Sequence, residues 1–258
     1  MLSNRSELIL SHLQTQGAEV HLSEIKALFP SVSESTLRRD LDRLAETGRV
    51  IRTYGGVLLA ANGNADDVLL RQSSRLDQKK LAAQAALAEL TSEHHVIYID
   101  AGSTCACLAR ILPEGERMLV TNDPSIAVQV ARKPGITTLL LGGMLNPSTL
   151  SVAGQWSLQQ LDSIHIDLAF MGTSGMATDT GFTNLNAVEC DLKTAVIDKA
   201  RRAIVLCDSG KFNLLFPFTF ARFNRIGAVA TDVPLPEDLA AQAAREGMAN
   251  LTGQKCGV

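Results

Sequence analysis

The sequence lacks any apolar run approaching the ~18 to 20 residues that a membrane-spanning helix needs. Its start, Met1-Leu2-Ser3-Asn4-Arg5-Ser6, also lacks the apolar stretch of a signal peptide. We therefore expect a cytoplasmic protein with no membrane partner.

Paired cysteine motifs are also missing. The cysteines are odd in number and include neither a Cys-x-x-Cys pair nor a His at ligand spacing, at positions Cys105, Cys107, Cys190, Cys207 and Cys256. Most lie among apolar residues, which favours buried free thiols over disulfides or a metal site. We expect no metal and no cofactor.

Neither sign of charge is in large excess, because the net charge is −3 with 20% charged and 46% hydrophobic residues. This ordinary globular composition excludes a disordered chain, collagen and a disulfide scaffold. The length of 258 residues suggests either one large domain or a small domain joined to a larger one, at ~100 to 200 residues per domain.

A shift in composition divides the chain. Residues 1–60 hold short helical patterns, with a helix-turn-helix at about 20–46, whereas residues 78–258 alternate apolar strands with helices. Between them the stretch from Ala60 to Asp67 is small, polar and acidic, so we interpret 61–77 as a linker.

The alternation in residues 78–258 predicts a mostly parallel α/β sheet covered on both faces. Strands are expected at Val96–Ile99, Met118–Thr121, Thr137–Leu141, Asp167–Met171, Ala203–Cys207 and Arg225–Ala230. Helices are expected at Gln78–Leu90, Thr104–Leu112, Pro124–Ala131, Gln155–Leu161 and Ala187–Ala200.

Glycine and small polar residues follow five of these strands. In open α/β sheets the ligand crevice lies at the carboxyl ends of the strands. Gly102-Ser103-Thr104 would open a helix there and offer backbone N–H groups to a phosphate, and the other residues offer acceptors, close backbone approach or a cation. The candidates that the residues themselves suggest are Asp100, Gly102, Ser103, Thr104, Asn122, Gly142, Gly143, Gly172, Gly175, Lys193, Asp208 and Lys211.

A phosphorylated polyol satisfies this chemistry, but each feature has an ordinary alternative. Glycines after strands are often only turn residues, and Gly-Ser-Thr at a helix start is often only a cap. The lysines and aspartates would then be solvated surface groups.

In the N-terminal module, a helix over residues 5–13 would turn Leu8, Ile9 and Leu13 inward, and a second helix runs from about Leu22 to Phe29. Ser33 would cap a third helix, whose Leu37, Leu41 and Leu44 form the buried stripe. Residues 49–60 resemble a hairpin, so a recognition helix beside a wing would suit the major groove of DNA.

The opposite face of the third helix is polar, with Ser35 and Arg39 at its centre and Thr36 and Arg43 beside them. Residues 1–60 hold seven basic and seven acidic residues, so charge alone favours DNA binding only weakly. These side chains could instead be an ordinary solvated helix surface with internal ion pairs.

The string from Val32 to Leu41, followed by Leu44, Gly48, Arg52 and Gly55-Gly56, closely resembles the N-terminal module of the DeoR-type family of bacterial transcriptional regulators. The resemblance continues in order through nearly the whole chain, at Arg71, Lys79, Asp100–Thr104, Thr121-Asn122, Gly142-Gly143, Gly172-x-x-Gly175, Glu189-x-x-x-Lys193 and Asp208-x-x-Lys211.

The resemblance implies a winged helix-turn-helix followed by a sensor domain similar in fold to ribose-5-phosphate isomerase. It implies a homo-oligomeric repressor of a carbohydrate operon that leaves double-stranded operator DNA when a phosphorylated sugar binds. It adds Glu189 to the effector candidates, and the DNA candidates become Ser33, Ser35, Thr36, Arg38, Arg39, Arg43, Arg52 and Tyr54.

Two departures and two alternatives remain. The turn from Phe29 to Ser33 is one residue longer than in many members, and Tyr54 stands where His is common. An isomerase would need a carboxylate as general base, for which only Glu189 is a candidate, so we expect no enzyme activity. A regulator of the same build could also activate transcription.

Overall fold

The computed structural model describes residues 4–16, 20–46, 49–52, 56–59 and 74–253. The chain forms two compact units, Met1–Arg75 and Leu76–Val258. Residues 60–73, most of the expected linker, lie outside the described residues, and the helix expected from residue 78 begins at Leu76. No helix in the described ranges is both long and apolar enough to cross a membrane.

In its described residues, the first unit contains three helices and a small antiparallel sheet with the strand order β1-β3-β2. Its elements are α1 (Asn4–Gln16), β1 (Val20–His21), α2 (Leu22–Leu28), α3 (Glu34–Glu46), β2 (Val50–Arg52) and β3 (Gly56–Leu59). The expected helices and hairpin are present. The sequence analysis missed β1, which is two residues long and pairs with β3.

The core of this unit confirms the buried stripe of α3, because Leu37, Leu41 and Leu44 are fully buried. The expectation for α1 was wrong at one position: the side chain of Leu8 is 54% exposed, while Leu10 is buried beside Ile9. Helical spacing allows either leucine to flank Ile9, and the packing of α1 against β3 and α3 selects Leu10.

Gly56 has a packing role in the wing. A β-carbon at this position would lie 2.3 Å from the carbonyl oxygen of Val20. Because β1 and β3 pair at this point, only glycine lets the two backbones approach.

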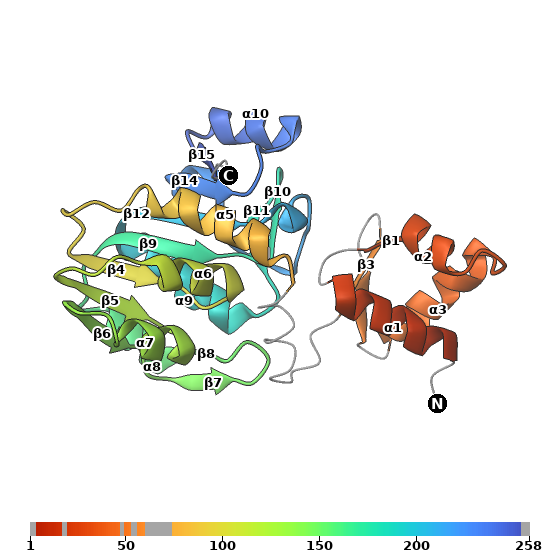
Figure 1. Cartoon of the computed structure of the whole chain (residues 1–258), viewed down its shortest axis with the longest axis horizontal. Helices are drawn as coiled ribbons and strands as arrows, with labels where there is room; N and C mark the ends of the chain where they lie inside the picture. Colours follow the sequence, from red (N-terminus) through yellow and green to blue (C-terminus); the bar gives the residue numbers. More distant parts are fainter. Residues whose placement is uncertain (1–3, 17–19, 47–48, 53–55, 60–73, 254–258) are drawn as a thin grey trace. The chain divides into compact units, whose positions relative to one another are not determined.

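The second unit is built on a seven-stranded parallel sheet with the order β15-β14-β12-β9-β4-β5-β6 (Figure 1). The strands are β4 (Val96–Ile99), β5 (Arg117–Thr121), β6 (Ile136–Leu140), β9 (Ile166–Gly172), β12 (Ala200–Cys207), β14 (Ala228–Thr231) and β15 (Ala249–Thr252). The fold class expected from the sequence, a small helix-turn-helix unit and a larger parallel α/β unit, is confirmed.

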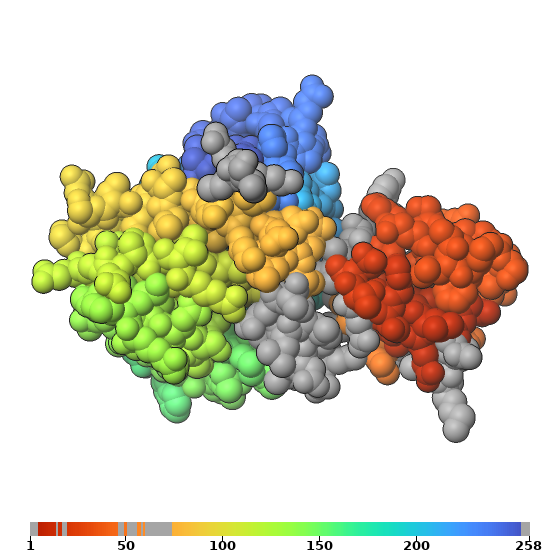
Figure 2. Space-filling view, viewed as in Figure 1, coloured from red at the N-terminus to blue at the C-terminus, as the bar shows by residue number. Residues whose placement is uncertain are grey.

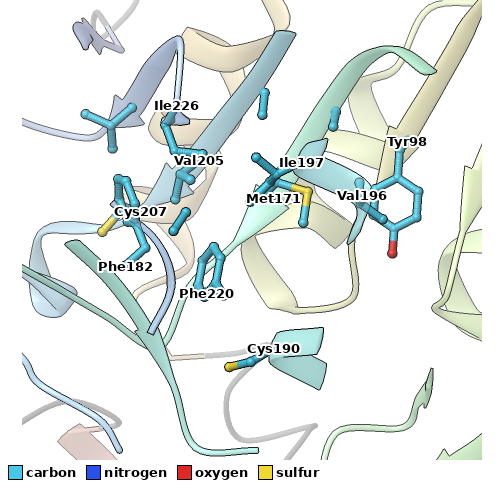
Figure 3. Packing of buried hydrophobic residues seen from close by; sticks show 14 of the residues in the cluster. Tyr98, Met171, Phe182, Cys190, Val196, Ile197, Val205, Cys207, Phe220 and Ile226 are labelled. Atoms are coloured by element: carbon cyan, nitrogen blue, oxygen red, sulfur yellow. The ribbon is translucent and has the colours of Figure 1, made fainter. Parts of the chain in front are cut away.

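Helices cover both faces of this sheet. One layer holds α5 (Leu76–Leu87), α6 (Ser103–Ile111) and α7 (Pro124–Val130), and α5 forms a gold band on the surface in Figure 2. The other layer holds α8 (Gln155–Leu161), α9 (Ala187–Lys199) and α10 (Glu237–Arg245). Figure 3 shows this second core, where Val196 and Ile197 of α9 lie near Met171 and Val205 of the sheet.

The smaller elements were not expected from the sequence. A separate hairpin pairs β7 (Met144–Asn146) with β8 (Ser151–Ala153). Another small sheet joins β10 (Gly175–Ala177), β11 (Gly181–Asn184) and β13 (Phe218–Ala221). The short helices η1 (Ser209–Lys211) and η2 (Phe223–Arg225) complete the unit.

The strand order reverses between β4 and β9. The chain runs outward from β4 through β5 to β6, and then returns to place β9 on the other side of β4. Such a reversal opens a crevice at the carboxyl ends of the two strands, where ligands bind in open α/β sheets. By this rule the candidate ligand crevice of the sheet lies beside Asp100 and Gly172.

The packing of the first unit predicts unequal effects for two leucines. We expect Leu41→Ala to destabilise this unit by about 2 to 5 kcal/mol, because it leaves a cavity in the core. Leu8→Ala is the matched control and should change the free energy of unfolding by less than about 0.5 kcal/mol, since the side chain is largely exposed. Urea unfolding followed by circular dichroism measures both, and equal losses would contradict the placement of Leu8.

Candidate effector and DNA-binding sites

A buried ion pair lies at the point where the strand order reverses. Asp100 follows β4, and its carboxylate pairs with the ammonium group of Lys193 from α9. The same Asp100 oxygen accepts a hydrogen bond of 2.9 Å from the N–H of Gly172, and Lys193 donates one of 3.0 Å to the carbonyl of Gly172. Three predicted site residues from β4, β9 and α9 are thus in direct contact.

Burial and mutual attraction act in opposite directions on this pair. Burial raises the pKa of Asp100, and the ammonium group of Lys193 opposes the rise. For Lys193, burial alone would lower the pKa, but the carboxylate of Asp100 outweighs it and the pKa is raised. Lys193 is therefore protonated, and its ammonium group faces the carboxylate of Asp100.

Asn122, at the end of β5, connects three parts of the crevice. Its side-chain oxygen accepts hydrogen bonds of 3.0 Å from the hydroxyl of Tyr98 and from the backbone N–H of Ala101. Its side-chain nitrogen donates to the carbonyl of Val152 in β8 at 3.2 Å. Asn122 therefore fixes the loop after β4 and holds the β7–β8 hairpin to the sheet.

The first turn of α6 opens directly after this loop. Gly102 precedes the helix with φ +129°, and no side chain caps it. A β-carbon on Gly102 would meet nothing within 4 Å, so the conformation and not crowding demands glycine. Gly102 is exposed, and Ser103 and Thr104 are half-buried. The carboxylate of Asp123 accepts a hydrogen bond from the N–H of Gly102, so the N–H groups that follow Gly102 are the ones that could receive a bound anion.

Glu189, near the start of α9, is saturated with hydrogen bonds. One carboxylate oxygen accepts from Asn146 at 3.0 Å, Thr149 at 2.6 Å and Ser151 at 2.9 Å. The other oxygen accepts from Asn184 at 3.1 Å. Burial alone would raise the pKa of Glu189, but these hydrogen bonds and the charge of Lys193 outweigh it, and the pKa is lowered.

The glycines at the ends of β6 and β9 differ in role. Gly142 has both backbone groups in use, since its N–H donates to Gln160 and its carbonyl accepts from Ser157. A β-carbon on Gly143 would lie 2.7 Å from the carbonyl of Ala153, and one on Gly175 would lie 2.3 Å from that of Leu214. Packing alone therefore accounts for Gly143 and Gly175.

Asp208 and Lys211 follow β12, the neighbour of β9. Asp208 is buried and caps η1 by accepting a hydrogen bond of 3.0 Å from the N–H of Gly210. Lys211 ends this short helix and is half-buried.

The sheet thus brings the predicted residues to one edge. The ends of β6, β5, β4, β9 and β12 are consecutive in the strand order, so Gly142, Asn122, Asp100, Gly172 and Asp208 follow one another along it. The sequence analysis missed the polar partners of these residues: Tyr98, Asn146, Thr149, Ser151 and Asn184. Of these, only Tyr98 could have been found from the sequence, because it is a polar residue within the apolar run of β4.

In the first unit, the predicted DNA-contacting residues lie along α3. Ser35, Arg38, Arg39 and Arg43 are exposed, and Thr36 is half-buried. Ser33 caps the helix, since its hydroxyl accepts a hydrogen bond of 3.2 Å from the N–H of Thr36. Arg52 lies in β2, and Tyr54 lies outside the described residues.

Ion pairs connect α3 to α1 and link neighbouring turns of α3. The guanidinium of Arg5 in α1 lies 2.5 Å from the carboxylate of Asp40, which is buried. Arg38 pairs with Glu34 at 2.8 Å, one turn earlier on the exposed surface. Arg5 therefore ties α1 to the buried side of α3, while Arg39 is on the exposed side.

A helix-turn-helix unit joined to an α/β unit with a polar crevice is the build of a DNA-binding regulator with a sensor domain. In the described ranges, no group of three or more His, Cys, Asp or Glu side chains could hold a metal ion. Four cysteines are buried and free, and Cys256 lies outside those ranges.

Comparison with known proteins agrees with this class. Residues 5–62 match the DeoR-like helix-turn-helix domain, and residues 74–233 match the DeoR C-terminal sensor domain. The chain therefore belongs to the DeoR family of transcriptional regulators, as the resemblance indicated. It is a regulator and not an enzyme, and its family binds DNA and senses a small molecule.

Relatives match over most of their length. The HTH-type transcriptional regulator FruR of Bacillus subtilis is 30% identical over 88% of this chain and 90% of its own. IolR of the same organism is 28% identical over 92% of each chain. GolR of Listeria innocua is 27% identical over 86% of this chain and 87% of its own.

Two solved structures align more distantly. Ribose-5-phosphate isomerase A of Methanocaldococcus jannaschii aligns with a TM-score of 0.39 at 19% identity, over 54% of this chain and 55% of its own. The sorbitol operon regulator SorC of Klebsiella pneumoniae aligns with a TM-score of 0.41 at 13% identity, over 96% of each chain. At such scores the alignments carry no argument about function.

The hydrogen bonds of Glu189 predict a pH-dependent stability difference. At neutral pH we expect Glu189→Gln to cost about 1 to 3 kcal/mol, because an amide group would face the donor Asn184. The folded-state pKa of Glu189 is lowered, so its contribution is present above the ordinary value of 4.5 and is lost as pH falls through the folded value. Urea unfolding of both proteins at pH 7 and pH 4 should show a smaller difference at pH 4. A difference that grows on acidification would refute the lowered pKa.

Proposed function

We propose that this regulator is a repressor of a carbohydrate catabolic or transport operon, and that a phosphorylated sugar bound in the crevice relieves repression. The observation that carries the proposal is the row of polar groups along consecutive strand ends, beside the uncapped first turn of α6. The residues proposed to bind the effector are those predicted from the sequence.

The crevice supports a ligand with both an anionic end and hydroxyl groups. Backbone N–H groups at the start of α6, with the hydroxyls of Ser103 and Thr104, would hold the phosphate. The carboxylate of Asp208, at the end of β12, would be an acceptor for sugar hydroxyls, whereas Asn122 is already engaged in the hydrogen bonds described above. Because Asp100 already neutralises Lys193, the first turn of α6 would supply most of the attraction for the phosphate.

The state of Glu189 argues against isomerase activity in this crevice. An aldose-ketose isomerisation needs a carboxylate that can take up a proton near neutral pH. Glu189 instead accepts four hydrogen bonds and has a lowered pKa, which makes it a poor base.

Relief of repression requires the effector to prefer the state that does not bind DNA. A tenfold loss of operator affinity needs a coupling free energy of ~1.4 kcal/mol between the two sites. A proposed aga operon transcriptional repressor of Escherichia coli O157:H7 is 30% identical over 92% of this chain, which favours repression over activation. Reporter output in a deletion strain distinguishes the two, since loss of a repressor raises expression.

The protein is further proposed to act as a homo-oligomer. Helix-turn-helix proteins commonly bind two half-sites with two copies of the module. The N-terminal unit has balanced charge, so a single copy has little general attraction to DNA and a second copy would raise the affinity.

The exposed position of Arg39 predicts a loss of DNA affinity on substitution. We expect Arg39→Ala to weaken operator binding by about 1 to 3 kcal/mol, if the guanidinium contacts a base edge. Arg245→Ala, the same change at an exposed site in α10, should leave operator binding unchanged. Fluorescence anisotropy with operator DNA measures both. If Arg39→Ala binds as tightly as the wild type, Arg39 has no contact with DNA.

The open turn at Gly102 predicts selective loss of effector binding. A sugar phosphate at a hundred times its dissociation constant should raise the melting temperature by roughly 5 to 11 °C, and its parent sugar should not. Gly102→Ala should abolish this shift, since φ +129° is unsuited to alanine and the turn must change shape. Gly115→Ala is the matched control, with φ +142° at the opposite edge of the sheet, before β5, and it should keep the shift.

The panel would hold pentose and hexose phosphates, each paired with its parent sugar. If no compound shifts the wild type, the crevice does not bind this class of ligand. If Gly102→Ala keeps the full shift, the phosphate lies away from α6.

A further inference from the structure

We propose that β7 and the surface beside it form the contact between two copies of this chain, with the two β7 strands pairing in antiparallel fashion across a two-fold axis. The proposal builds on the proposed homo-oligomer but does not depend on the identity of the effector. It rests on three independent features of the segment from Pro134 to Leu161.

The first feature is a set of large apolar side chains that stand in solvent. Met144 is 79% exposed, Leu145 54% and Trp156 67%, and Leu140 at the end of β6 is 41% exposed. Ser157 of α8 donates a hydrogen bond of 2.7 Å to the carbonyl of Gly142, midway between Leu140 and Met144. The start of α8 therefore lies against this loop, and Trp156 is brought close to the segment from Leu140 to Leu145.

The second feature is a free strand edge. In the described part of the chain β7 pairs with β8 alone, with Leu145 opposite Val152. The other side of β8 is occupied, because the N–H of Val152 donates to the carbonyl of Asn122 at 2.8 Å. Figure 1 shows β7 as the outermost strand at the lower edge of this unit. An apolar edge strand without charge is a template for pairing with another chain.

The third feature is charge, and it identifies the occupant as a second copy. The 28 residues from Pro134 to Leu161 contain no Asp, Glu, Lys, Arg or His, although the chain average of 20% Asp, Glu, Lys and Arg would place between five and six charged residues there. In a contact across a two-fold axis, a residue near the axis meets its own copy, so a charge there would face the same charge. A surface without charge is complementary to itself, and depletion of charge is typical of the centre of protein interfaces.

Antiparallel strand pairing also has the symmetry that the contact requires. Two identical strands related by a perpendicular two-fold axis run antiparallel, and the residue at the axis faces its own copy. Leu145 is the middle residue of β7. The geometry therefore places Leu145 at or next to the axis, with Trp156 flanking it.

The first test is the oligomeric state of the full chain by sedimentation velocity at micromolar concentration. We expect the wild type to sediment as a dimer or larger. The Leu145→Glu variant should no longer pair through β7, because the substitution places like charges at the two-fold axis. The dissociation constant of this contact between copies should rise at least tenfold. Val128→Glu is the matched control, since Val128 is 60% exposed on α7, and it should assemble as the wild type does.

A second test holds even where Leu145→Glu fails to fold. In a Cys256→Ser background the four remaining cysteines are buried, so Leu145→Cys adds one accessible thiol. A short bis-maleimide should join two copies of this variant into a covalent dimer and leave Val128→Cys as single chains.

The outcomes distinguish the proposed β7 contact from the broader proposal that the protein is a homo-oligomer. If Leu145→Glu assembles as the wild type does and Leu145→Cys is not cross-linked, the copies meet elsewhere and the β7 contact is wrong, while the homo-oligomer stands. If the wild type is a monomer throughout, both are overturned. Release of DNA by a sugar phosphate is tested separately and is unaffected by either result.

Discussion

The buried contact between Asp100 and Lys193 is the interaction on which the crevice depends. Removing two charges from water costs several kcal/mol per ion, and the cost is offset only where the pair and its further hydrogen bonds are well placed. Here Gly172 supplies both further partners, one donor and one acceptor. The pair therefore fixes α9 over the reversal point between β4 and β9.

This arrangement changes the electrostatics expected for an anionic ligand. The sequence offered Lys193 as a possible cation for a phosphate, but in the structure its charge is neutralised by Asp100. Glu189 is held in a similar way by donors from the β7–β8 hairpin and Asn184. The two charged groups of α9 nearest the crevice thus organise the surrounding loops, and the first turn of α6 after Gly102 is left to attract an anion.

The sequence was most informative where local pattern and burial agree. The central strands are continuous apolar runs because both faces of a parallel sheet are covered, so β4 was predicted at its observed bounds. By contrast, β1, β7 and β8 are two or three residues long and owe their pairing to distant partners. The exchange of Leu8 for Leu10 in the core has the same cause. Helical spacing permits either residue to face inward, and only the packing decides between them. The strand-end residues were predictable from topology, whereas their partners Asn146, Thr149 and Ser151 depend on where one hairpin docks.

That hairpin connects the proposed effector crevice to the proposed contact between two copies. Its inner strand β8 is bonded to Asn122, and Ser151 with the neighbouring loop residues contacts Glu189, so it is tied to the wall of the crevice. Its outer strand β7 carries the exposed apolar side chains. A ligand that displaced any of the donors to Glu189 would remove support from the hairpin, because a two-stranded ribbon has little stability alone. Any contact made by β7 would then respond to occupancy of the crevice through the side chains of Asn146, Thr149 and Ser151, which donate to Glu189. Such a response would need no rearrangement of the central sheet.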